Sequence, residues 1–135
     1  MSRTRRVVGI LAGALLVLSA GAHCFLGGAA LRAELVAANV PADLLRGAMI
    51  GWYFGGIAML AFGGIVLHTF ARQRPPAPAS LAPAQIVAAT YLLFGVGALV
   101  ATGFDPFFLV FLVPGLLLAA AVSPERLSAG AGTKT

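Results

Sequence analysis

Four long apolar blocks, separated by short polar or proline-rich segments, dominate the chain and cover about residues 7–30, 47–70, 84–103 and 107–122. A helix needs about 20 consecutive apolar residues to cross the hydrocarbon core of a bilayer. Inside lipid a helix also satisfies its own backbone hydrogen bonds, which an irregular segment cannot do. The pattern therefore predicts an all-α integral membrane protein, a bundle of four transmembrane helices that forms one domain over residues 1–122.

The composition agrees with lipid as the solvent. Of the 135 residues, 60% are hydrophobic and 10% are charged, whereas a soluble domain is about 45–50% apolar and about a quarter charged. A water-soluble globule of this size cannot bury such a surplus of apolar side chains. This excludes an ordinary soluble domain.

The first apolar block follows three arginines, and such a start also resembles a secretory signal peptide. Ala20 and Ala22 supply the small residues of a cleavage pattern. The apolar run continues past this point to about Ala30, however, which gives the length that a span requires. We expect this block to be retained as a span, with a cleaved signal peptide as the alternative.

The segments between and after the blocks have different characters. Residues 32–46 mix charged and apolar positions around Pro41, which predicts a short amphipathic segment on the outer membrane surface. The proline-rich run 75–78 predicts an extended loop. Residues 123–135 are small and polar, which indicates a disordered cytoplasmic tail.

The distribution of basic residues predicts the orientation. Loops on the cytoplasmic side of membrane proteins carry an excess of Lys and Arg, and a four-span topology divides the nine basic residues seven to two. The seven are Arg3, Arg5, Arg6, Arg72, Arg74, Arg126 and Lys134, and the two are Arg32 and Arg46. Both termini are therefore predicted to be cytoplasmic. The net charge of +5 does not indicate a nucleic-acid partner, because no basic helix or arginine–aromatic surface accompanies it.

Glycines recur at helical spacing in the first two blocks. Gly47, Gly51 and Gly55 lie four residues apart, and Gly9 and Gly13 repeat the interval. Small residues on one face allow two membrane helices to approach closely. We expect these faces to be helix-packing interfaces, either within the bundle or against another subunit.

A few polar side chains within or beside the blocks are candidate chemistry, since polar residues in membrane segments are costly. His23, Trp52, Tyr53 and Asp105 fall at similar predicted depth near the outer face and could form a small ligand pocket, with Asp105 orienting or charging His23. In the alternative interpretation, the aromatic residues belong to an interfacial belt and His23 bonds a backbone carbonyl. Tyr91 is interpreted in the same way as a belt residue of the opposite interface.

Other chemistries are disfavoured by spacing. His23 and His68 fall at opposite ends of the bundle, so they cannot both ligate one haem iron, and no group of residues has metal-ligand spacing. The single cysteine, Cys24, excludes an intrachain disulfide. No nucleophile is paired with a base. We therefore expect a protein without enzyme activity, and the residues identify no cofactor.

Two short motifs support a family resemblance. The first block holds Ser-Ala-Gly-Ala-His at 19–23, and the second opens with Trp-Tyr-Phe-Gly-Gly at 52–56. With the four-span layout, these motifs resemble the DoxX-like and related small four-span bacterial membrane proteins. That resemblance implies accessory or small-ligand roles beside membrane redox systems. The small multidrug transporters share the length but rely on a Glu in the first span, and no acid lies between Val7 and Ala30.

These features favour a non-enzymatic accessory or structural subunit of a larger assembly in a bacterial inner (plasma) membrane. Its partners would be the lipid bilayer and either other membrane subunits or further copies of itself. The alternative is a protein that binds a small ligand, such as a quinone, a pigment or a haem, near the outer face. A small transporter is the third hypothesis, and it would need a polar path that the second and fourth blocks do not offer.

Overall fold

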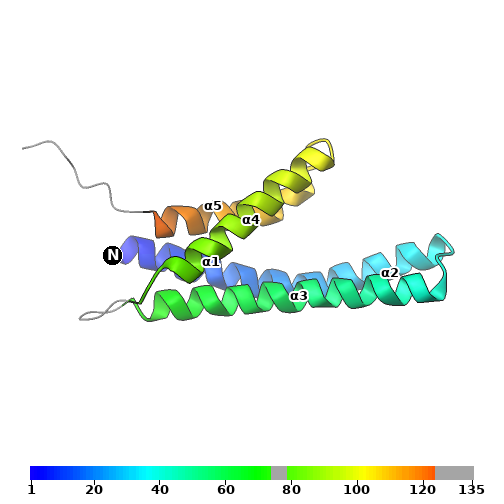
Figure 1. Cartoon of the computed structure of the whole chain (residues 1–135), viewed down its shortest axis with the longest axis horizontal. Coiled ribbons are helices and arrows are strands. Elements are labelled where there is room, and N and C mark those ends of the chain that lie inside the picture. The colour runs from blue at the N-terminus through cyan, green and yellow to red at the C-terminus, as the bar shows by residue number, and fades with distance from the viewer. Residues whose placement is uncertain (74–78, 124–135) are drawn as a thin grey trace, which may run out of the picture.

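The protein is all-helical wherever the computed structural model describes it, which is over residues 1–73 and 79–123 (Figure 1). This confirms the predicted fold class at the level of secondary structure. The predicted loop at 75–78 and nearly all of the predicted tail lie outside the described residues. In chain order the elements are α1 (Arg3–Ala22), the π-helix η1 (His23–Gly27), α2 (Gly28–Ala37), α3 (Ala42–Ala71), α4 (Ala82–Ala101), the 3-10 helix η2 (Pro106–Phe108) and α5 (Leu109–Val122).

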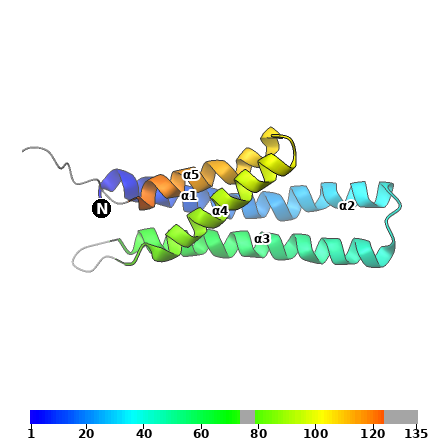
Figure 2. The same cartoon turned by 45° about the horizontal axis from the view of Figure 1, so that its top comes forward.

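The helices form two antiparallel hairpins. In the first, α1, η1 and α2 run as one continuous helix of 35 residues alongside α3. In the second, α4 runs alongside α5. The hairpins meet at the end that holds the N-terminus, which we call the N-terminal end, and the tip of the second diverges from the first (Figures 1 and 2). The first hairpin continues well beyond that tip to the α2–α3 turn, which we call the turn end.

The lengths of the helices support a membrane protein. Three helical stretches, Arg3–Ala37, Ala42–Ala71 and Ala82–Ala101, are long and apolar enough to cross a bilayer, and Pro106–Val122 is a shorter apolar one. The last helix continues through Pro114, which is buried against its neighbours. The structure thus provides three full-length candidate spans and one short one where the sequence predicted four.

The segment 32–46 does not form the separate amphipathic surface element that its sequence predicted. It is divided between the end of α2 and the start of α3, which are joined by a turn at 38–41. Asn39 adopts a left-handed conformation with φ of 55°, and the Val40 N–H donates to the Leu35 carbonyl at 3.1 Å. This is the Schellman arrangement that ends helices. Pro41 then provides the extended residue from which α3 begins.

The hydrophobic core lies in the N-terminal half of the bundle. Helices α1, α3, α4 and α5 all contribute to it, and its largest fully buried side chains include Leu16, Val66, Phe70, Val87 and Leu118. The other half of the first hairpin, which runs from η1 through α2 and the start of α3 and which we call the turn half, has few buried residues. There are none in η1, one in α2, and none in α3 before Gly56. Burial is therefore concentrated where the two hairpins meet.

Glycines allow the close approach within each hairpin. A Cβ at Gly63 would lie 3.0 Å from the backbone nitrogen of Val17 and 3.2 Å from the carbonyl oxygen of Gly13. A Cβ at Gly9 would overlap the ring of Phe70. The predicted glycine face of the first span thus packs against α3, although its partner there is Gly63.

The other predicted glycine face is largely open. A Cβ at Gly47 or Gly51 would have no atom within 4 Å, and one at Gly55 would meet only the Nε2 of His23 at 3.5 Å. The interpretation that Gly47 and Gly51 pack within the bundle is therefore wrong for the described residues. The start of α3, where these two glycines lie, is beyond the part of the first hairpin that the second hairpin covers (Figures 1 and 2). Contact with another subunit stays a prediction.

Two arginines join helix ends at the N-terminal end of the bundle. Arg5 donates from Nε to the Ala121 carbonyl at 3.1 Å and from its guanidinium to the Ser123 carbonyl. Arg6 donates from Nε to the Phe70 carbonyl at 3.2 Å. These carbonyls belong to the last turns of α5 and α3 or directly follow them, where helices leave acceptors unsatisfied and the dipole favours a positive charge. The start of α1 is thus tied to two other helices.

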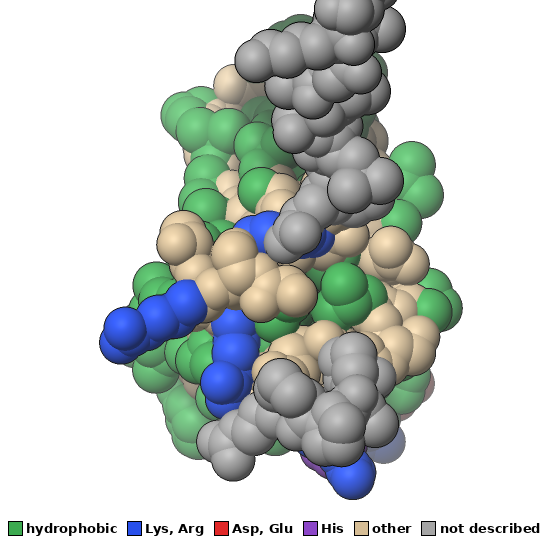
Figure 3. All heavy atoms as spheres, turned by 90° about the vertical axis from the view of Figure 1, so that its left-hand side faces the viewer, with side chains coloured by type: hydrophobic (Ala, Val, Ile, Leu, Met, Phe, Trp, Pro, Cys, Tyr) green, Lys and Arg blue, Asp and Glu red, His purple; other side chains and the backbone are tan. Residues whose placement is uncertain are grey.

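Charge is also segregated along the bundle. Figure 3 looks onto the N-terminal end and shows arginine side chains there, with no Asp or Glu of the described residues in view. The acids of the described residues lie elsewhere: Glu34 and Asp43 near the α2–α3 turn, and Asp105 at the α4–α5 turn.

Candidate functional site

His23 and Trp52 form a reciprocal contact between the two helices of the first hairpin. The Trp52 indole Nε1–H donates to the His23 carbonyl at 2.8 Å, and His23 Nε2 lies 3.1 Å from the Trp52 carbonyl. Because a carbonyl oxygen can only accept, Nε2 must carry the hydrogen. The two rings stack with centroids 4.1 Å apart and an angle of 7° between their planes. We call this pair the His–Trp clasp.

The local sequence makes room for the clasp. His23 opens the π-helical segment, and its carbonyl accepts the Gly28 N–H as well as the indole. Single π-helical turns within α-helices often occur at functional sites. A Cβ at Gly27 would lie 2.8 Å from the Trp52 ring, and one at Gly56 would overlap the sulfur of Cys24. Gly27 and Gly56 thus leave the space that the contact needs, and Gly56 belongs to the second of the two motifs used for the family resemblance.

The structure brings together only part of the predicted outer pocket. His23 and Trp52 are in direct contact, and Tyr53 lies near Gly28 with 46% of its surface exposed. Asp105 does not join them. Its carboxylate accepts the Phe107 N–H at 2.9 Å as the N-cap of η2, on the tip that diverges from the first hairpin (Figures 1 and 2).

The predicted role of Asp105 in orienting His23 is therefore wrong. A carboxylate before a helix start is satisfied locally by backbone N–H groups, and the divergence of the hairpins removes it from the imidazole. His23 instead bonds a backbone carbonyl, as the alternative interpretation expected.

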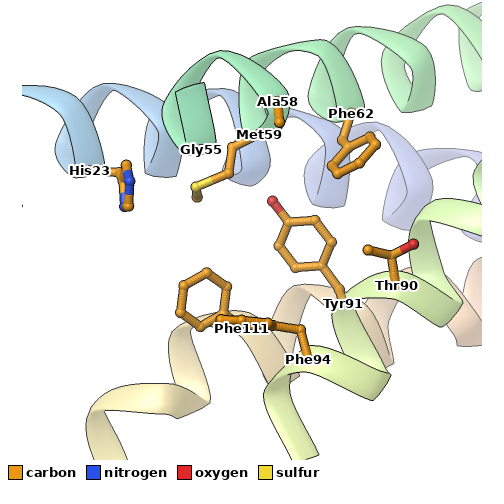
Figure 4. A pocket seen from close by; sticks show the side chains of 9 residues that line it. All are labelled: His23, Gly55, Ala58, Met59, Phe62, Thr90, Tyr91, Phe94 and Phe111. Carbon is orange, nitrogen blue, oxygen red and sulfur yellow. The ribbon is translucent and has the colours of Figure 1, made fainter. Parts of the chain in front are cut away.

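A pocket of about 240 Å³ lies deeper in the bundle, in the angle between the two hairpins (Figure 4). It was not predicted from the sequence. Its α3 wall consists of Gly55, Ala58, Met59 and Phe62, its α4 wall of Thr90, Tyr91 and Phe94, and His23 and Phe111 complete it.

Tyr91 is the distinctive residue of this pocket. It is only 5% exposed, so it is a core residue and not the interfacial residue that its sequence position suggested. Its ring lies edge-on to Phe62 at 6.3 Å and at a tilt to Phe111 at 6.2 Å. Its hydroxyl is buried and has no hydrogen-bond partner among the described residues. The neighbouring Thr90 hydroxyl, in contrast, donates to the Ile86 carbonyl at 3.0 Å.

The remaining chemistry of the described residues is sparse. Over 1–73 and 79–123, no group of three or more His, Cys, Asp or Glu side chains could hold a metal ion. Cys24 is a free thiol against Gly56. Among the described residues, the arrangement is therefore an apolar pocket beside one buried hydroxyl that has no partner.

Removal of the indole N–H from the clasp should weaken the first hairpin. Hydrogen bonds between membrane helices contribute about 0.6 kcal/mol on average and up to about 2 kcal/mol, so Trp52→Phe should lower the free energy of unfolding by that amount. Unfolding by sodium dodecyl sulfate in mixed micelles, followed by circular dichroism, measures this change. Phe54→Leu is the control, because Phe54 is 72% exposed. Equal stability of Trp52→Phe and wild type would show that the clasp adds nothing.

Comparisons of the chain with protein-family models, with curated proteins and with solved structures found no match. The resemblance to the DoxX-like proteins therefore stays a prediction from two motifs and the layout of the spans.

Proposed function

We propose that this chain is a non-enzymatic accessory or structural subunit of a larger assembly in a bacterial inner membrane. The observation that carries the proposal is the uncovered turn half of the first hairpin. From the start of α3 to Gly55 no residue is buried, although the other half of the same helix contributes Val66 and Phe70 to the core. The second hairpin covers one half only (Figures 1 and 2).

The uncovered half offers a surface suited to another membrane helix. Helices in lipid associate through small residues that permit close backbone contact. Gly47 and Gly51 provide such a surface one turn apart, and no described atom lies within 4 Å of where their Cβ would be. Within the chain, Gly9, Gly13 and Gly63 permit such close contact, and the space beside each of them is filled by atoms of the neighbouring helix. A helix of a partner protein would make the same kind of close contact at Gly47 and Gly51.

The length of the first hairpin supports contact outside the hydrocarbon as well. Helices of 35 and 30 residues extend about 52 and 45 Å, whereas the hydrocarbon core is about 30 Å thick. The turn end therefore reaches into or past the headgroups. It carries Arg32, Glu34, Asp43 and Arg46 together with exposed Leu44. Because the turn end protrudes and carries both charged and apolar side chains, it suits contact with a protein partner.

The proposed orientation follows from the charges at the N-terminal end. Arg3, Arg5, Arg6 and Arg72 lie there among the described residues, and the described acids do not. The positive-inside rule places this end and both termini in the cytoplasm. The protruding turn end would then contact its partner on the outer side.

Mild purification from the native membrane tests the accessory role. We expect wild-type protein and Gly64→Leu to retain a stoichiometric partner, and Gly51→Leu to lose it while keeping its helical content. Both glycines are exposed, and a Cβ at either one meets no neighbour within 4 Å in this chain, so the two substitutions are a matched pair. Gly64 lies in the half of α3 that contributes to the core. A pure single-component product from wild type, or a partner retained equally by both variants, would contradict the proposal.

A further inference from the structure

We propose that the pocket between α3 and α4 binds the ring of a lipid-soluble molecule, through a carbonyl oxygen that accepts a hydrogen bond from the Tyr91 hydroxyl. The proposal concerns a site inside the chain, so it goes beyond the accessory role and does not depend on it. Figure 4 shows the Tyr91 hydroxyl directed from α4 toward α3, into the space that Met59 and Phe62 border.

The unpaired hydroxyl is the first argument. A buried donor without a partner is unfavourable, because it has lost its water and gained nothing. Tyr91 is 5% exposed, and its hydroxyl finds no acceptor among the described residues. In a membrane interior no bulk water can replace that acceptor. An acceptor carried by a bound molecule would satisfy it.

Tyr91 is the one residue lining the pocket whose polar side-chain group has no partner among the described residues. The Nε2–H of His23 is already directed at the Trp52 carbonyl, and the Thr90 hydroxyl at the Ile86 carbonyl. No Lys or Arg lines the pocket, so it contains no charge to balance a carboxylate or a phosphate. A neutral acceptor, such as a ring carbonyl, fits this chemistry, and an anionic lipid headgroup does not.

The depth of the site in the membrane also argues against a phospholipid as the bound molecule. Tyr91 is the tenth of the 20 residues of α4, so it lies near the middle of that span. Ester carbonyls of phospholipids lie at the interface, far from this position. A carbonyl that reaches the middle of a bilayer must belong to a molecule that is itself soluble in the hydrocarbon.

The walls and the volume indicate a ring. Phe62, Phe94 and Phe111 present aromatic faces and edges, which favour stacked or edge-on contact with another ring. The volume of about 240 Å³ is below the roughly 300–1,000 Å³ of sites that enclose a whole drug-sized ligand. Phe94 is 53% exposed, so the pocket opens to the lipid-facing surface. A ring would enter there and leave an apolar tail among the lipids, as a quinone with an alkyl chain would.

Decyl-substituted benzoquinone is a suitable probe, because Trp52 is the single tryptophan and stacks on His23 at the pocket wall. We expect saturable quenching of its fluorescence in detergent-solubilised full-length protein. Tyr91→Phe should raise the half-saturating concentration about five- to tenfold, the effect of one lost hydrogen bond. Tyr53→Phe removes the hydroxyl of the exposed second tyrosine and should bind like wild type.

Thermal unfolding separates loss of binding from loss of fold. Without quinone, Tyr91→Phe should melt at or above the wild-type temperature, because it removes an unpaired buried hydroxyl. With quinone at about ten times the dissociation constant, wild type should gain about 3–6 °C, Tyr91→Phe less, and decane should add nothing. Quenching that never saturates, equal affinity of Tyr91→Phe and wild type, equal stabilisation by decane, or a lower melting temperature of quinone-free Tyr91→Phe would overturn the proposal.

Discussion

Gly63→Ala should lower the free energy of unfolding by about 1–3 kcal/mol, the usual cost of overpacking a tight contact. The added methyl group would lie 3.0 Å from the Val17 backbone nitrogen and 3.2 Å from the Gly13 carbonyl oxygen. Backbone atoms cannot move aside as a flexible side chain can, so α1 and α3 would have to separate. Unfolding by sodium dodecyl sulfate in mixed micelles, followed by circular dichroism, measures the loss.

The adjacent position supplies the control. A Cβ at Gly64 meets no atom within 4 Å, so Gly64→Ala should leave stability unchanged or raise it by up to about 1 kcal/mol through the better helix propensity of alanine. Equal effects of the two substitutions would mean that α1 and α3 do not approach through Gly63, and the arrangement of the first hairpin would have to be revised.

Gly95→Ala is expected to destabilise the second hairpin by a similar amount, about 1–3 kcal/mol. Its Cβ would lie 3.0 Å from the Leu112 backbone nitrogen, whereas Gly97 faces open space. Gly97→Ala is therefore the matched control on the same helix. The readout is the same unfolding assay, supplemented by proteolysis of the α4–α5 hairpin in detergent. A Gly95→Ala protein as stable as the Gly97→Ala protein would contradict the packing of α4 on α5.

The sequence predicted the helices well because lipid imposes a simple rule on them. Each span must satisfy its own backbone and show an apolar surface, so long apolar blocks report helices directly. The ends were predicted less well. Asn39 and Gly103 both adopt left-handed conformations after a helix, and they end α2 and α4. Glycine after a helix is a common stop signal and asparagine a less frequent one, so the continuation of α2 as far as Ala37 was missed.

The choice among glycines could not be made from spacing. Gly47 and Gly51 have the same interval as Gly9 and Gly13, yet only the second pair meets another helix. Spacing shows which residues share a face, but not where two hairpins converge. That is also why Gly63 and Gly95 were not singled out. Their importance comes from the crossing points of helices that are distant in sequence.

The candidate site likewise contains residues that the sequence could identify and residues whose role depends on how distant helices pack. His23 and Trp52 could be found because polar groups in apolar spans are rare and must find partners. Asp105 was predicted to join them on depth alone, and its local role as the cap of η2 prevailed. Tyr91 was taken for an interfacial residue. Its burial arises only where α4 crosses α3 and α5, so no local pattern could reveal the pocket.

Site-directed photocrosslinking in native membranes tests the central claim that the uncovered half of the first hairpin contacts a partner. A photoreactive amino acid is placed at position 51 in one variant and at position 64 in the other, both at glycines with open space around them. We predict a discrete protein adduct from position 51, and only lipid adducts from position 64. Lipid adducts alone at both positions would contradict the account.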